Sequence, residues 1–157
     1  MFDFLKKKIP GFEKKCVTHF NNYSETKEFV EKMSKEVSKG IHVFYHKNIF
    51  EAVYSTNLLM RQVELLITKP SELAFYPVVK VMMKHIGGHE VYGAIHAQEI
   101  GDSTFECPDK KSMTEMLDRL INDKELLIHL NEQIVKLKAT GIYDGGYKAV
   151  KLAVKGK

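Results

Sequence analysis

Apolar residues recur at helical spacing along several stretches of this chain. The stretch over residues 24–39 begins at Ser24, a favourable N-cap residue, and its apolar stripe ends at Gly40. A longer stripe over residues 49–68 follows Asn48, whose side chain can cap a helix. The spacing predicts one helix in each of these two stretches.

A third apolar stripe covers residues 113–139. Ser112 and Glu115 stand at its start in the arrangement of a capping box, in which each side chain bonds to the backbone of the other residue. Asn122–Asp123 interrupts the stripe, so we predict helix over this range with a break or a second cap at that point.

Between these stretches the pattern fits more than one kind of element. Residues 41–46 suit a short strand or the first turns of a helix. Residues 77–86 predict a helix, with a strand over residues 78–83 as the alternative because valine is frequent there. Residues 91–107 fit either a helix or the two arms of a hairpin.

The pattern as a whole predicts a mainly α fold, a compact helical domain of about five to six helices. The alternative is an α+β fold with a small antiparallel sheet built from residues 41–46 and 91–107. A length of 157 residues suits a single domain over residues 1–157. Within it, residues 1–23 form an N-terminal arm, and residues 141–157 form a basic tail that is a short helix or a loose end.

Composition places the chain among ordinary globular proteins, with 44% hydrophobic and 28% charged residues. Charged residues interrupt every apolar stretch before the roughly 20 residues that a membrane span needs. The N-terminus is apolar before it becomes basic, the reverse of a secretory signal. Cys16 and Cys107 form no Cys-x-x-Cys pair, which suits a reducing compartment. We expect a soluble, cytoplasmic protein without a transmembrane segment.

The net charge of +4 is concentrated near the ends of the chain. Residues 136–157 contain 6 lysines against one acidic residue, Asp144. Such a tail is compatible with a nucleic acid or an anionic membrane surface, but it contains no arginine for bidentate phosphate contacts. A solvated tail is therefore favoured, and nucleic acid is a disfavoured partner.

Histidine is the one enriched reactive residue type, with seven in the chain. His42 and His46 are four residues apart, so they share a face on a helix or a strand and could bind one metal ion. His85 and His89 have the same spacing, although Gly87–Gly88 between them disfavours a continuous helix. These four histidines are the candidate metal ligands.

Several catalytic signatures are absent from the sequence. After His89–Glu90 the zinc-protease motif requires a second histidine, but Gly93 occupies that position. Phosphate-binding loops, the Gly-x-Ser-x-Gly nucleophile motif and the Glu-x-x-His pattern of di-iron bundles are also missing. We therefore predict no catalytic residue.

One resemblance concerns a cofactor. Phe44 and Tyr45 in an early element, with His96 shortly before Ile100–Gly101, look like the haem pocket of a sensor globin. The likeness covers a handful of residues and lacks the aromatics that usually follow the haem-ligating histidine. It implies haem binding by His96, Phe44 and Tyr45, and it identifies no family.

The sequence therefore predicts, mainly by elimination, a non-enzymatic helical binding or sensory module for a partner protein or a small ligand. A homo-oligomer is compatible with this hypothesis. The second hypothesis is a haem-binding or metal-binding sensor or redox protein that uses the central histidines. The third is an accessory protein of nucleic acids or membrane surfaces.

Overall fold

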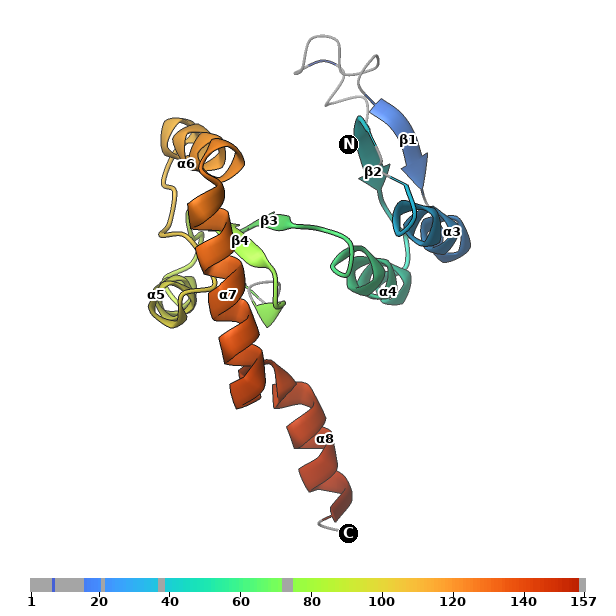
Figure 1. Ribbon diagram of the computed structural model, residues 1–157. Coiled ribbons are helices and arrows are strands. Elements are labelled where there is room, and N and C mark those ends of the chain that lie inside the picture. The colour runs from blue at the N-terminus through green and yellow to red at the C-terminus, as the bar shows by residue number, and fades with distance from the viewer. Residues whose placement is uncertain (1–6, 8–15, 21, 37–38, 72–74, 156–157) are drawn as a thin grey trace. The chain divides into compact units, whose positions relative to one another are not determined.

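The structure is a computed structural model (Figure 1). It describes residues 7, 16–20, 22–36, 39–71 and 75–155. The chain divides into two compact units, Met1–Val63 and Glu64–Lys157. The single domain expected over residues 1–157 stays a prediction.

The first unit combines a strand pair with two helices. Its elements are β1 (Cys16–Phe20), α3 (Tyr23–Met33), β2 (Ile41–Phe44) and α4 (Ile49–Leu59). The strands β1 and β2 are parallel. Asn22 caps α3 by accepting a hydrogen bond from the backbone N of Glu25, and Asn48 caps α4 in the same way.

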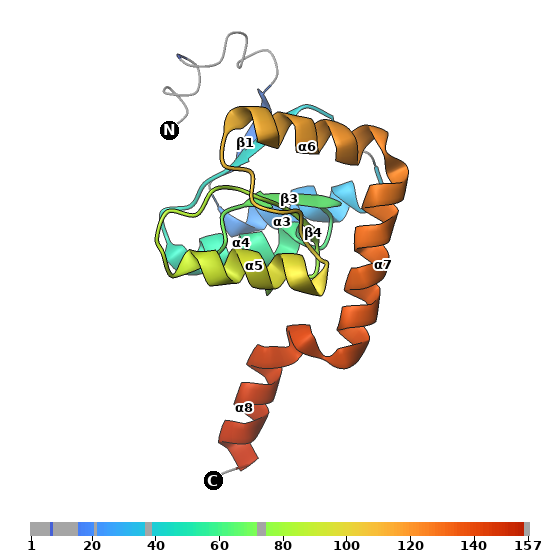
Figure 2. The same cartoon turned by 90° about the vertical axis from the view of Figure 1, so that its left-hand side faces the viewer.

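The second unit contains a strand pair, four helices and a short 3-10 helix within its described residues. They are β3 (Leu65–Thr68), β4 (Val79–Met82), α5 (Glu90–Ile100), α6 (Lys110–Asn122), α7 (Lys124–Thr140), η2 (Ile142–Asp144) and α8 (Gly145–Lys155). The strands β3 and β4 are parallel and lie between α5 and α6 in both views (Figures 1 and 2). The last helix, α8, extends away from the rest of this unit, and its side chains are exposed (Figure 2).

Strand β4 lies at the centre of the second unit because it is paired on both sides. One side pairs with β3, and the other bonds to the irregular segment 102–107. In that segment the backbone N of Thr104 donates to the carbonyl of Lys80, and the backbone N of Cys107 donates to the carbonyl of Met82. All four residues of β4 are buried as a result.

The two faces of β4 contribute to different clusters, because successive side chains of a strand point to opposite sides. Val79 and Val81 belong to a core cluster with residues of α6 and α7. Met82 packs with Ala94 and Ala97 of α5. Lys80 shares the Met82 side, so a charged residue faces the α5 side of the strand.

The prediction of a mainly α fold is confirmed, with small sheets as a minor component. The alternative antiparallel sheet is wrong. Residues 41–44 are indeed a strand, but it pairs in parallel with β1. Within the range 91–107, residues 91–100 form helix α5, and the rest bridges to β4 in parallel.

Two predicted helices end earlier than expected, and a third, over residues 77–86, is wrong. The helix expected over 24–39 ends at Met33 in α3, and the one expected over 49–68 ends at Leu59, because residues 65–68 pair with β4 as strand β3. Residues 77–86 contain β4, so the alternative of a strand there is confirmed.

The break expected in the third stripe is confirmed at Asp123, whose carboxylate caps α7. The capping box that opens α6 lies three residues earlier than expected. It joins Asp109 to Ser112, because the Asp109 carboxylate accepts from the Ser112 backbone N at 2.8 Å. The helix begins at Lys110 for that reason.

The two ends of the chain differ in how far the structure describes them. Of the arm predicted over residues 1–23, residues 16–20 form β1, and most of the remainder lies outside the described residues. The tail predicted over residues 141–157 contains η2 and α8, so its helical alternative is confirmed. Over the described ranges, none of the helices combines the length and the apolar character that crossing a membrane requires.

Candidate functional site

The second unit contains a pocket of about 580 Å³ along one side of α5. Glu90, Gly93, Ala97 and Ile100 recur at helical spacing, and therefore line the pocket from a single helix face. The complete set of described lining residues is Lys69, Pro70, Ser71, Phe75, His89, Glu90, Gly93, His96, Ala97, Ile100, Asp102, Ile142 and Tyr143.

Apolar side chains also line the pocket from outside α5. Pro70 and Phe75 come from the segment between β3 and β4, and Ile142 comes from η2. Polar side chains line the pocket as well, so polar groups and apolar surface face the same space. The main polar residues are Lys69, His89, Glu90, His96, Asp102 and Tyr143.

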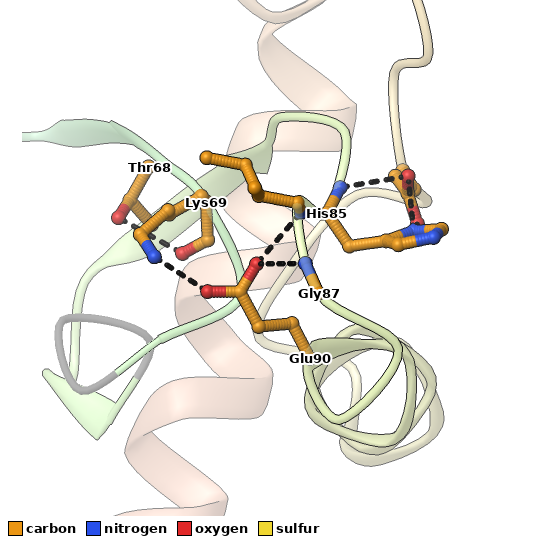
Figure 3. A network of polar contacts seen from close by, with 7 residues as sticks. Thr68, Lys69, His85, Gly87 and Glu90 are labelled. Carbon is orange, nitrogen blue, oxygen red and sulfur yellow. Dashed lines mark hydrogen bonds and ion pairs between the residues drawn. The ribbon is translucent and has the colours of Figure 1, made fainter.

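Glu90 is held in place by contacts from two directions (Figure 3). Its Oε1 lies 2.5 Å from Nζ of Lys69, and its Oε2 accepts hydrogen bonds from the backbone N atoms of Ile86 at 2.8 Å and Gly87 at 3.5 Å. The carboxylate is buried, whereas the Lys69 side chain is 45% exposed. The Ile86 hydrogen bond first, and Lys69 next, lower the pKa of Glu90 to about 2. Glu90 is therefore an anion with a fixed orientation, joining α5 to the loop before it and to the segment after β3.

Lys80, Asp102 and Tyr143 form a second polar group, in which Asp102 follows the C-terminal end of α5, whereas Glu90 is the first residue of that helix. Nζ of Lys80 lies 2.5 Å from Oδ2 of Asp102, and the Tyr143 hydroxyl donates a hydrogen bond to the same oxygen at 2.8 Å. The Lys80 and Asp102 side chains are 0% and 1% exposed. Burial lowers the pKa of Lys80, and the hydrogen bond and charge of Asp102 oppose that change. Burial, and then the hydrogen bond to Asp102, raise the pKa of the Tyr143 hydroxyl.

The local backbone explains why Lys80 and Asp102 meet. Gly101 ends α5 with a φ of 82°, a left-handed conformation that glycine adopts readily. The chain then turns to run beside β4, and the backbone N of Lys80 donates to the carbonyl of Asp102. The two residues are neighbours in the sheet as well as through their side chains.

The other carboxylate oxygen of Asp102 differs from the first. Oδ1 is buried, and it accepts no hydrogen bond from any residue of the described ranges. A buried acceptor without a partner is uncommon in native proteins, because it has lost its hydration without replacement. This oxygen belongs to a residue of the pocket wall.

The predicted histidine sites lie in different parts of the structure. His89 and His96 both line the pocket. His85, which Figure 3 shows beside the Glu90 contacts, does not line it. Its Nδ1 lies 2.9 Å from Oε1 of Glu106. This contact is the largest cause that lowers the pKa of Glu106. The structure thus brings His89 and His96 to a shared space, whereas His85 is bonded elsewhere.

His42, Phe44, Tyr45 and His46 belong to the first unit. The His42 ring packs against the ring of Phe29, with centroids 4.6 Å apart, and Phe44 packs on the same ring at 5.5 Å. Tyr45 is exposed. The His46 side chain is buried, and its Nδ1 lies 3.7 Å from a carboxylate oxygen of Glu51. Two of these aromatic rings therefore pack around Phe29.

No group of three or more His, Cys, Asp or Glu side chains is arranged to hold a metal ion in the portion of the chain that the structure describes. Metal binding by His42, His46, His85 and His89 stays a prediction, as does haem binding by His96, Phe44 and Tyr45. Of these residues only His89 and His96 line the pocket.

Lys80, Asp102 and Tyr143 were not predicted from the sequence as residues of this site. Lys80 was visible as a lysine inside the apolar run of residues 77–86, and such a residue in a buried strand signals a buried partner. No signal of comparable strength marks Asp102 or Tyr143, because the contact of Asp102 with Lys80 spans 22 residues and that of Tyr143 with Asp102 spans 41.

The elements and the pocket define a mainly α protein with short parallel strand pairs and a ligand-sized cavity in its second unit. The chain belongs to the protein family described as domain of unknown function DUF6938, whose model matches residues 1–154. Searches of curated proteins and of solved structures found no match to the chain.

Proposed function

We propose that the second unit is a binding module for a small organic molecule, held in the pocket beside α5. The observation that carries this proposal is the pocket itself, in which a few fixed polar groups converge on a largely apolar wall. This proposal corresponds to the small-ligand form of the leading sequence-based hypothesis.

The size of the pocket supports a ligand of modest dimensions. Its volume of about 580 Å³ falls within the range of roughly 300–1,000 Å³ typical of small-molecule sites. Pro70, Phe75, Ala97, Ile100 and Ile142 supply apolar surface, so the body of the ligand would be apolar.

The polar groups of the pocket are held by the protein before any ligand binds. Glu90 is fixed by Lys69 and by two backbone N atoms, and Asp102 is fixed by Lys80 and Tyr143. Preorganised polar groups favour affinity and specificity because little ordering remains for the binding step. His89 and His96 add ring nitrogens for further contacts.

Two variants of α5 test the proposal. A Cβ atom at Gly93 would meet Pro70 at 3.7 Å, an ordinary contact, so Gly93→Leu should fold while its side chain enters the pocket. Gln98→Leu adds the same side chain at an exposed position of α5 and serves as the matched control.

The experiment is a fragment screen of the full chain by two-dimensional NMR, followed by titration of the hits. We expect hits whose shift changes centre on α5, segment 69–71 and η2. Their affinity should fall at least about tenfold in Gly93→Leu and stay unchanged in Gln98→Leu. Hits that bind Gly93→Leu and the natural chain equally, or an absence of hits near α5, would contradict the proposal.

A further inference from the structure

We propose that Oδ1 of Asp102 is the recognition point of the pocket and that it accepts a hydrogen bond from a neutral O–H or N–H group of the ligand. This inference rests on the proposed function, and it specifies the chemical class of the ligand as a neutral donor on an apolar body, such as an alcohol or an amide.

The two oxygens of the Asp102 carboxylate differ in the hydrogen bonds that they accept. Oδ2 already receives Lys80 at 2.5 Å and Tyr143 at 2.8 Å, whereas Oδ1 receives no donor from the described residues. A carboxylate has lone pairs for about four hydrogen bonds, so Oδ1 retains its full capacity. Leaving it unpaired in a buried position costs free energy that a donor from a ligand would recover.

Asp102 lies beside the space that the ligand would occupy. Asp102 follows Gly101 at the C-terminal end of α5 and belongs to the pocket wall, together with Ile100 and Tyr143. Oδ1 itself is buried, so a ligand donor reaches it by displacing the side chains that cover it, while Oδ2 keeps its contacts with Lys80 and Tyr143.

Both carboxylates among the described residues of the pocket wall are already paired with a lysine. The Asp102 carboxylate is paired with the Lys80 ammonium, and the other carboxylate of the pocket wall, Glu90, is paired with Lys69. A cationic ligand would therefore bury a positive charge near Lys80 without an anion left to neutralise it, which is unfavourable in a desolvated space. An anionic ligand would meet the carboxylate oxygen directly. A neutral donor satisfies Oδ1 and leaves the balance of charge intact.

The test compares four probes with the same naphthalene body and titrates each into the full chain, with NMR shifts reporting the site. They are 2-naphthylmethanol, the nearly isosteric 2-ethylnaphthalene, 2-naphthylmethylamine as the cation and 2-naphthoate as the anion. We expect the alcohol to bind about tenfold more tightly than 2-ethylnaphthalene, although the hydrocarbon is the more hydrophobic of the two. The amine and the carboxylate should bind more weakly than the alcohol.

A variant that replaces the polar group by apolar residues is the control. Lys80→Met, Asp102→Leu and Tyr143→Phe combined remove both charges and the hydroxyl together, so no buried partner is left unpaired. In this triple variant we expect 2-ethylnaphthalene to bind at least as tightly as the alcohol. If the variant does not fold, the comparison of the four probes with the natural chain still decides the matter.

The binding results distinguish a failure of the role proposed for Asp102 from a failure of the pocket as a binding site. Equal or tighter binding of 2-ethylnaphthalene by the natural chain, with shifts near α5, overturns the role of Asp102 while the pocket remains a binding site. Tightest binding of the amine also overturns it, in favour of a cation site. Failure of all four probes to bind counts against the proposed function itself.

Discussion

Nζ of Lys80 and Oδ2 of Asp102 lie 2.5 Å apart, between side chains that are almost completely removed from solvent. The pair joins the central strand β4 to the end of α5, and Tyr143 connects it to η2. Each charge is tolerated in the interior because the other is present. The pair and Tyr143 therefore join three elements of the second unit, and two of these residues, Asp102 and Tyr143, belong to the pocket wall.

Removal of one member of this pair should be far more damaging than removal of both. Lys80→Met leaves the Asp102 carboxylate buried without a cation, and we expect it to lower the free energy of unfolding by about 3–5 kcal/mol. Lys80→Met combined with Asp102→Leu should lower it by much less than the sum of the two single changes. Urea denaturation of the four proteins in this double-mutant cycle provides the measurement.

The ion pair of Lys111 with Glu115 on α6 is a control for this cycle. Its atoms are 3.8 Å apart and its side chains are 85% and 66% exposed, so Lys111→Met should change the free energy of unfolding by less than about 1 kcal/mol. Additive effects of Lys80→Met and Asp102→Leu would show that the two side chains do not interact in solution as they do in the structure.

Glu90 should make the protein sensitive to acid. Its pKa is lowered from 4.5 to about 2 in the folded protein, so the ionised carboxylate stabilises the fold. The sign of the shift means that this contribution is complete above the unfolded pKa and is lost as the pH falls from about 5 toward 2. As the pH is lowered over that interval, the free energy of unfolding should decrease less in Glu90→Gln than in the natural chain.

Urea denaturation at a series of pH values measures this difference. Hydrogen bonds also lower the pKa of two other acidic groups, Glu106 and Asp109. Their contributions are common to both proteins and cancel in the comparison. Glu99→Gln, an exposed change on the same helix, should follow the natural chain. Parallel pH profiles of Glu90→Gln and the natural chain would rule out the proposed role of Glu90.

Local patterns in the sequence were sufficient for the helices that carry their own signals. The apolar stripe and the cap at Asp123 predicted α6 and α7 and the break between them, because these features depend on residues within one or two turns. The helix expected over residues 49–68 failed where long-range pairing intervened. Residues 65–68 fit the helical stripe, but their backbone bonds to β4, more than ten residues along the chain.

The candidate site was predictable only in part for the same reason. His89 and His96 were singled out as reactive residues, and they do line the pocket. Lys80, Asp102 and Tyr143 come from β4, the end of α5 and η2, and no periodicity relates positions on separate elements. Only the tertiary arrangement brings their side chains together.

Replacement by alanine should change the stability in opposite directions at Gly93, within α5, and at Gly101, directly after it. Gly101 has a φ of 82°, so Gly101→Ala forces a left-handed conformation on a residue with a Cβ atom, and should destabilise the protein by about 1–2 kcal/mol. Gly93 lies within the helix with room for a Cβ atom, and Gly93→Ala should stabilise it by about 0.5–1 kcal/mol. Thermal and urea denaturation measure both effects. A neutral Gly101→Ala would mean that the end of α5 differs from the turn described.

The Cys107 thiol should react slowly in the folded protein. It is a free cysteine, 4% exposed, in the core cluster that joins β4 to α6 and α7. Burial is the main cause that raises its pKa, and the thiolate is the nucleophilic form, so both access and ionisation oppose alkylation.

Iodoacetamide labelling at pH 8, followed by mass spectrometry of the peptide that contains Cys107, measures this reactivity. We expect the folded chain to be labelled at least about a hundredfold more slowly than the same chain in urea, because the reaction must await an opening of the core. Lys111→Met should leave the labelling rate unchanged, because its exposed ion pair contributes little to stability. Lys80→Met should raise the rate, because the loss of stability that we expect from it makes such openings more frequent. Labelling at the rate of the unfolded chain would show that Cys107 is not buried in solution.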